Sequence, residues 1–171
     1  MRVFQVLALV AIIALAGLLG WREYQLNYAP RPALPALELT GLEARAGFDP
    51  SGQSQAYLIN VLSPDCLDCR SQMPVLSALA AEGITLYALF HGEDADAANL
   101  FLDEYGDPFA GVMLTTGDEL LADFGTSDLP FTVIVSNEGE IIALIEGAID
   151  LSVLQSKIYP ALEREARRNR G

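Results

Sequence analysis

The chain has 171 residues, a length that suits one domain with a terminal appendage. Acidic residues outnumber basic residues by 23 to 10, which gives a net charge of −13 at pH 7. A surface this acidic repels phosphate, so nucleic acid is not an expected partner. A basic protein partner and simple solubility are both compatible with the charge.

The first segment of the chain is apolar. From Val3 to Gly20 it carries no charge, and a membrane-spanning helix needs about 20 largely apolar residues. Arg2 precedes this run, and positive charge there favours an orientation that places the rest of the chain outside the cytoplasmic membrane. A cleavable signal peptide is the alternative, because Ala14-Leu15-Ala16 offers a small-x-small cleavage site. Both alternatives deliver the following domain to the same side.

A linker and a folded domain are expected after this segment. The linker shows no hydrophobic periodicity and contains Pro30, Pro32 and Pro35, which favour extended chain. The predicted division is therefore a membrane anchor or signal peptide at 1–22, a linker at 23–35 and a domain at 36–171.

The domain alternates buried strands with amphipathic helices. After a strand-like entry at 36–42, strands are predicted at 56–62, 84–90, 112–114, 131–135 and 140–146. Helices are predicted at 66–81, 94–105, 118–124 and 151–168. In the helix at 94–105, Leu100 and Phe101 are expected on the inner side. This order of elements predicts an α/β domain with a mixed sheet.

The two cysteines of the chain, Cys66 and Cys69, stand where a predicted buried strand gives way to a helix. A disulfide with this spacing closes too short a loop to stabilise a fold by much, so chemistry explains the pair better. Unpaired N–H groups and the positive end of the helix dipole stabilise a thiolate on Cys66, the expected nucleophile. Cys69 lies one turn further in and can resolve the mixed disulfide. A CxxC sequence at such a junction indicates a redox motif.

The residues around the pair resemble a known family. The segment 57–89, with Arg70, Pro74 and Leu76 in register after the cysteines, is similar to the thioredoxin-like proteins of the DsbE/CcmG, ResA and TlpA group. Three later segments are similar to the DsbE type in particular: 91–109, 126–140 and 147–160. The resemblance covers about residues 35–162, nearly all of the chain after the apolar segment.

The resemblance implies a thioredoxin-like fold, a central mixed β-sheet flanked by helices, preceded by an N-terminal transmembrane helix. It implies a single-pass protein of the inner membrane with its soluble domain facing the periplasm, which reduces protein disulfides in cytochrome c maturation. The partners would be apocytochrome c, or a thiol protein of the haem-attachment machinery, and a membrane electron donor of the DsbD/CcdA type. The resemblance implies no cofactor and no bound metal.

Leu129 and Pro130 match the position of the family's cis-proline, which faces the CxxC pair. The resemblance therefore implies that Leu129, Pro130 and Phe131 bind substrate, with an extended peptide pairing there as an added strand. The sequence also departs from the family pattern. Asp65 replaces the Trp before the first cysteine, Leu62 replaces another Trp, and Phe131 replaces the Glu after the proline.

Asp65 and Asp68 flank the expected nucleophile. One interpretation is that they cap the helix and match its dipole. The other is redox tuning, because nearby carboxylates raise the pKa of the Cys66 thiol and make the couple more reducing. Asn60 stands where thioredoxin has a buried Asp that accepts a proton, which Asn cannot do, and Glu146 is a candidate acceptor.

Two other functions are compatible with the sequence. The first is a general thiol reductase or oxidase that serves other envelope proteins. The second is a binding module of thioredoxin fold that handles copper or haem, for which Cys66, Cys69, Met73 and His91 offer soft ligands.

Overall fold

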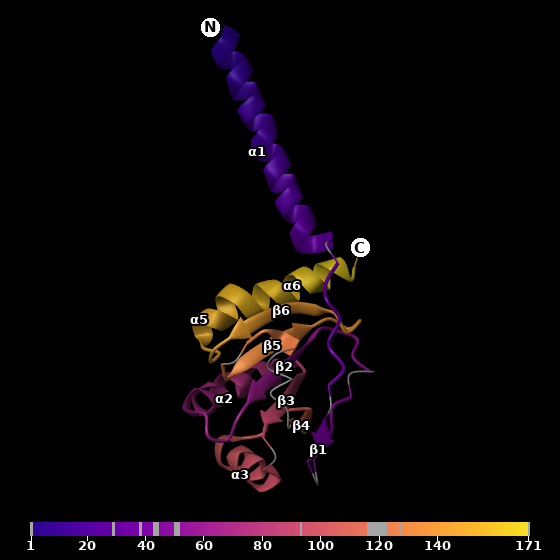
Figure 1. Cartoon of the computed structure of the whole chain (residues 1–171), viewed down its shortest axis with the longest axis vertical. Helices are drawn as coiled ribbons and strands as arrows, with labels where there is room; N and C mark the ends of the chain where they lie inside the picture. The colour runs from indigo at the N-terminus through magenta and orange to yellow at the C-terminus, as the bar shows by residue number, and fades with distance from the viewer. Residues whose placement is uncertain are drawn as a thin grey trace. The chain divides into compact units, whose positions relative to one another are not determined.

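The computed structural model describes residues 2–28, 30–37, 39–42, 45–49, 52–92, 94–115, 123–126 and 128–170. The chain divides into two compact units, Met1–Arg31 and Pro32–Gly171. Figure 1 follows the chain from α1 in the first unit to α6 at the end of the second.

The first unit contains α1 (Arg2–Tyr28). By length and composition alone, one helix among the described residues could cross a membrane: the stretch Phe4–Arg22 of α1 has a mean hydropathy of 2.3. A signal sequence near the N-terminus passes the same test. The helix continues past residue 22, where we expected the anchor to end, because no proline or glycine follows Trp21 before Tyr28. The first part of the predicted linker is therefore helical.

The second unit is built on a six-stranded mixed sheet with the order β1-β4-β3-β2-β5-β6. Its strands are β1 (Thr40–Gly41), β2 (Tyr57–Leu62), β3 (Leu86–His91), β4 (Gly111–Thr115), β5 (Phe131–Val135) and β6 (Ile141–Glu146). The central strand β2 pairs in parallel with β3 and antiparallel with β5. All six residues of β2 are buried, which explains its nearly continuous apolar run. The predicted mixed sheet is confirmed, although the entry strand is confined to β1.

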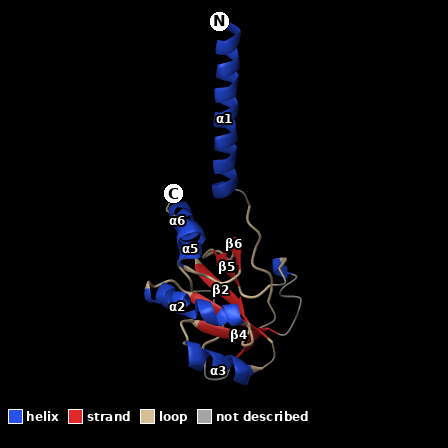
Figure 2. Ribbon diagram, turned by 90° about the vertical axis from the view of Figure 1, so that its left-hand side faces the viewer, coloured by secondary structure: helices blue, strands red, loops and turns tan. Residues whose placement is uncertain are grey.

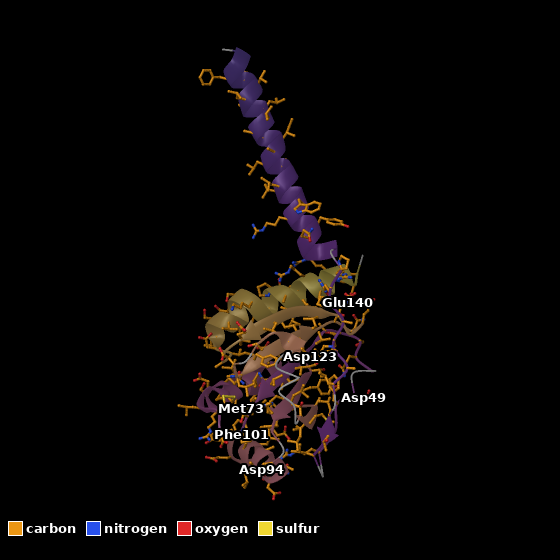
Figure 3. The ribbon with its side chains drawn as sticks, viewed as in Figure 1. Asp49, Met73, Asp94, Phe101, Asp123 and Glu140 are labelled. Carbon is orange, nitrogen blue, oxygen red and sulfur yellow. A yellow bond between two sulfur atoms is a disulfide. The ribbon has the colours of Figure 1, made fainter. Side chains whose placement is uncertain are left out.

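The described helices of this unit that are labelled in Figure 2 pack against one face of the sheet. They are α2 (Leu67–Ala81), α3 (Ala95–Tyr105), α5 (Leu151–Val153) and α6 (Tyr159–Arg168), and the π-helical turn η1 (Leu154–Ile158) joins the last two. Met73 of α2 and Phe101 of α3, labelled in Figure 3, belong to the core on this face. The opposite face packs against the segment before β2 and against Phe124. The predicted helix at 118–124 lies outside the described residues except for its last two.

The prediction for the inner side of α3 is half wrong. Phe101 is buried, but Leu100 is 69% exposed. The buried residues of α3 are Ala98, Phe101 and Leu102. They follow the i, i+3, i+4 spacing of one helix face, and Leu100 falls off that face.

The C-terminal helix predicted at 151–168 is present, but η1 interrupts it. Pro160 follows that turn, in the first turn of α6. A proline ring inside a helix clashes with the carbonyl four residues earlier, here that of Ser156, and the wider π-helical turn relieves the clash. Leu154 and Ile158 stay buried in spite of the interruption.

Candidate active site at the Cys66–Cys69 disulfide

Cys66 and Cys69 form a disulfide at the N-terminus of α2, with their Cα atoms 5.2 Å apart. Cys66 is the N-cap residue, and its Sγ accepts a hydrogen bond from the backbone N–H of Cys69 at 3.1 Å. Its sulfur thus satisfies one of the N–H groups that a helix start leaves unpaired. Cys69 is fully buried, whereas Cys66 is partly exposed. An incoming thiol or disulfide therefore meets Cys66 first.

The sheet brings Pro130 to the same edge as the disulfide. β2 ends at Leu62, shortly before Cys66, and β5 runs antiparallel to β2 with Phe131 opposite Val61. The start of β5 consequently lies beside the end of β2. The Leu129–Pro130 peptide bond is cis, as the resemblance implied.

The three expected substrate-binding residues differ in accessibility. Leu129 is partly exposed and Pro130 is buried. Phe131 is fully buried, and its ring packs against Phe124 with centroids 5.5 Å apart. The backbone of Phe131 pairs with Val61 on one side and Glu146 on the other. Leu129 is therefore the residue of the three whose side chain reaches the surface.

The rim of the site is acidic and apolar. Asp65 and Asp68 are both exposed, and Leu67 between the cysteines is 75% exposed. Asp68 lies in the first turn of α2, where a carboxylate complements the positive end of the helix dipole. A partner that approaches Cys66 meets this rim first.

Arg70 supports the turn before the cysteines. Its Nη2 donates a hydrogen bond to the carbonyl of Pro64 at 2.9 Å. Its guanidinium also lies over the ring of Tyr105, 5.8 Å from the centroid. The hydrogen bond to Glu104 raises the pKa of Tyr105, burial adds to the effect, and Arg70 acts in the opposite direction. The arginine thus joins α3 to the loop that carries Cys66.

A buried polar network lies behind the disulfide. Asn60 Nδ2 donates to Thr132 Oγ1 at 2.8 Å, and Gln72 Nε2 donates to Asn60 Oδ1 at 3.0 Å. The backbone N–H of Ile149 donates to Gln72 Oε1 at 3.1 Å. Sequence reasoning identified Asn60 but missed Gln72. A polar residue three positions after Cys69, on a face otherwise occupied by Met73 and other apolar side chains, was the available signal.

The remaining candidates lie at the same edge or in the core. His91 ends β3 and is partly exposed, and Glu146 is exposed opposite Phe131. Met73 is fully buried. Within the ranges that the structure describes, no group of three His, Cys, Asp or Glu side chains could hold a metal ion.

No family model matches the sequence. The chain is 30% identical over 130 residues to the thiol:disulfide interchange protein HelX of Rhodobacter capsulatus, covering 75% of this chain and 74% of HelX. It is also 30% identical over 135 residues to the thiol:disulfide interchange protein DsbE of Yersinia pestis, covering 77% of this chain and 71% of that protein.

Among solved structures, a thiol-disulfide isomerase from Corynebacterium glutamicum matches with a TM-score of 0.64 and 17% identity. The match covers 77% of this chain and 96% of the isomerase, which shows that the fold is thioredoxin-like. With this fold, a disulfide at the start of α2 and these relatives, the chain belongs to the DsbE-type thiol:disulfide interchange proteins and is a disulfide oxidoreductase.

Proposed function

We propose that this protein reduces disulfides of other proteins, with Cys66 as the attacking nucleophile and Cys69 as the resolving cysteine. The observation that carries the proposal is the unequal exposure of Cys66 and Cys69 at one helix N-terminus. A Cys66 thiolate keeps the hydrogen bond from the Cys69 N–H and faces the positive end of the α2 dipole. Because Cys69 is buried, it can attack the mixed disulfide on Cys66, while other thiols in solution do not reach Cys69.

The reaction begins with the reduced dithiol. The Cys66 thiolate attacks one sulfur of the partner's disulfide, forms a mixed disulfide and releases the partner's other sulfur as a thiolate, which takes up a proton. Cys69 then loses its proton, attacks Cys66 Sγ and displaces the partner's first sulfur, which is also protonated. Two electrons have passed to the partner, and Cys66–Cys69 is again a disulfide.

The acidic rim supports a reducing direction. Asp65 and Asp68 disfavour negative charge on Cys66, so they raise the pKa of its thiol and oppose the dipole and the N–H donor. A less stable thiolate shifts the couple toward the disulfide form and makes the dithiol a better reductant. Both carboxylates are exposed, so this effect is modest and sensitive to salt.

Docking is proposed at Leu129 and Pro130. The partner's backbone lies along this segment beside the disulfide, and the partly exposed Leu129 contacts it together with Leu67. Phe131 contributes by packing beneath the segment, because its side chain is buried.

The proposed setting is the periplasmic side of the inner membrane, with α1 as a single-pass anchor and residues 36–171 as the catalytic domain. The apolar stretch Phe4–Arg22 and the preceding Arg2 support this orientation. The proposed partner is apocytochrome c, or a thiol protein that attaches haem to it, and a DsbD/CcdA-type membrane protein returns the electrons. The DsbE-type relatives support a role in such a thiol pathway.

The test uses the full chain in detergent, reduced beforehand, with apocytochrome c whose haem-attachment cysteines are joined as a disulfide. The wild-type protein should reduce apocytochrome c to its dithiol form. Cys69→Ser should accumulate a mixed disulfide between Cys66 and apocytochrome c. Mass spectrometry after acid quenching detects this mixed disulfide. Cys66→Ser is the matched control and should do neither. A mixed disulfide trapped on Cys69 instead, or no reduction by the wild type, would contradict the proposal.

A further inference from the structure

Gln72 lies in a loop of contacts behind the disulfide, which four hydrogen bonds and two short backbone segments, 130–132 and 147–149, close together. Its side chain is fully buried, and both ends of its amide are paired, with Ile149 and with Asn60. Asn60 donates a hydrogen bond to the hydroxyl of Thr132, and Thr132 is two residues after Pro130 in the chain. The loop of contacts therefore joins α2 to β2, β5 and the segment after β6.

The other half of the loop of contacts returns to Pro130. The backbone N–H of Gly147 donates to the carbonyl of Pro130 at 2.9 Å, and Ile149 follows two residues later. The segment between β6 and α5 thus binds Pro130 through the N–H of Gly147 and Gln72 through the N–H of Ile149. The Gln72 amide connects the disulfide-bearing helix to the docking segment proposed above.

One backbone group, the N–H of Ile149, sets the direction of the three hydrogen bonds that involve the amide side chains. Ile149 offers an N–H, so the oxygen of Gln72 must face it and the NH₂ group must face Asn60. Asn60 consequently presents its oxygen to Gln72 and its NH₂ group to the Thr132 hydroxyl. Each amide oxygen and each NH₂ group has a partner in this network, and such pairing favours one arrangement of buried polar side chains.

We propose that Gln72 is a positioning residue for thiol–disulfide exchange, holding the Pro130 segment in register with the Cys66–Cys69 pair through a network that carries no titratable group. The inference rests on the proposed function, because the proposed function places the partner's backbone along Leu129 and Pro130. Gln72 touches neither the partner nor the reacting sulfurs in this account. It acts through Asn60 and Ile149.

The network is neutral, whereas the titratable and charged groups around the pair lie nearer the surface. On the described elements packed around the site, these groups are Asp65, Asp68 and Arg70 by α2, Tyr105 of α3, His91 of β3, Asp128 before β5, Glu146 of β6 and Asp150 before α5. Each of them is at least partly exposed. Protons gained and lost by the two thiols therefore exchange with solvent or with these outer groups.

The first measurement separates positioning from general stability. Gln72→Leu removes both hydrogen bonds at similar volume, and Leu79→Ala is the matched control, because Leu79 is buried on the same helix far from the loop of contacts. Urea unfolding measures the free energy of unfolding of both variants, so that their kinetics can be compared at a known loss of stability. With insulin as a protein disulfide, Gln72→Leu should raise KM about threefold to tenfold, the effect of a lost hydrogen bond. The rate with a small aromatic disulfide, dithiobis(nitrobenzoic acid), should be unchanged.

The second measurement tests the neutrality of the network and needs no turnover. Gln72→Glu keeps the shape of the side chain and places a carboxyl group one turn from Cys69. In the reduced full chain, alkylation of each thiol against pH should show one more ionisation in Gln72→Glu than in the wild type, with the pKa of Cys69 raised.

The inference is overturned if Gln72→Leu slows insulin and the small disulfide equally, as Leu79→Ala would through lost stability alone. It is also overturned if the alkylation profiles of Gln72→Glu and the wild type coincide. A wild type that reduces neither substrate contradicts the proposed function instead, and the alkylation profile then still decides whether a charge at position 72 reaches the thiols.

Discussion

The backbone N–H of Cys69 donates a hydrogen bond to Sγ of Cys66, 3.1 Å away, at the first turn of α2. The resolving cysteine therefore supplies, through its own backbone, a donor to the sulfur that it later attacks. The two residues differ in exposure as well, because Cys69 is fully buried. This relationship gives each sulfur one role in the reaction.

In the reduced protein, Cys66 should react with iodoacetamide faster than Cys69. The N–H donor and the helix dipole favour the Cys66 thiolate, and burial disfavours a thiolate at Cys69. Mass spectrometry after brief alkylation of the full chain near neutral pH measures both sites. Preferential labelling of Cys69 would reverse the assigned roles.

Replacement of both rim carboxylates, Asp65→Asn with Asp68→Asn, should lower the pKa of the Cys66 thiol and make the couple less reducing. The shift should stay below about one pKa unit, because both carboxylates are exposed and screened by solvent. Alkylation rate against pH measures it, and added salt should reduce the difference from the wild type. Asp96→Asn, an exposed acid on α3, is the control and should change neither quantity. An unchanged thiol pKa in the double variant would assign the two acids to helix capping alone.

Gly111→Ala should destabilise the fold by about 1–3 kcal/mol, the usual cost of overpacking. A Cβ atom at Gly111 would overlap the backbone carbonyl of Gly47 and press on the ring of Tyr87. Gly41→Ala is the matched control in the neighbouring strand, because nothing lies within 4 Å of its added Cβ. Urea denaturation of both variants checks this, and equal midpoints would show that the segment at Gly47 moves aside freely.

The fold should lose stability above about pH 10, in part through Tyr57. Burial, with a smaller contribution from Tyr87, raises the pKa of Tyr57 to about 12. The unfolded chain therefore releases this proton at lower pH than the folded protein, and stability falls as the pH rises from about 10 through about 12. Tyr57→Phe should lose less stability than the wild type between about pH 9 and pH 11 in urea unfolding. Equal losses in the two proteins would contradict the shifted pKa.

The centre of the sheet was predictable because its strands are buried and their sequences are almost continuously apolar. β2 and β5 have no exposed residue, so pattern and burial coincide. Periodicity was less informative on α3, where adjacent apolar residues left the inward face ambiguous and Leu100 was misplaced. The turn η1 depends on the clash between the ring of Pro160 and the preceding helix. Hydrophobic periodicity does not predict such a clash.

The reactive pair was predictable from its spacing and its place between a strand and a helix. The supporting residues were not, because their roles depend on contacts between distant segments. Gln72 is an ordinary polar residue in the sequence, and its function follows from Ile149, 77 positions away. Phe131 was expected in the substrate groove, but the pairing of β5 turns its side chain into the core.

The most direct test of the central claim is the reduction potential of the Cys66–Cys69 couple in the full chain, equilibrated in detergent against glutathione or dithiothreitol. The proposed reductant should have a potential at or below about −200 mV, toward the about −270 mV of thioredoxin. A potential near about −120 mV, the value of the oxidant DsbA, would contradict the reductive function and the effect assigned to Asp65 and Asp68.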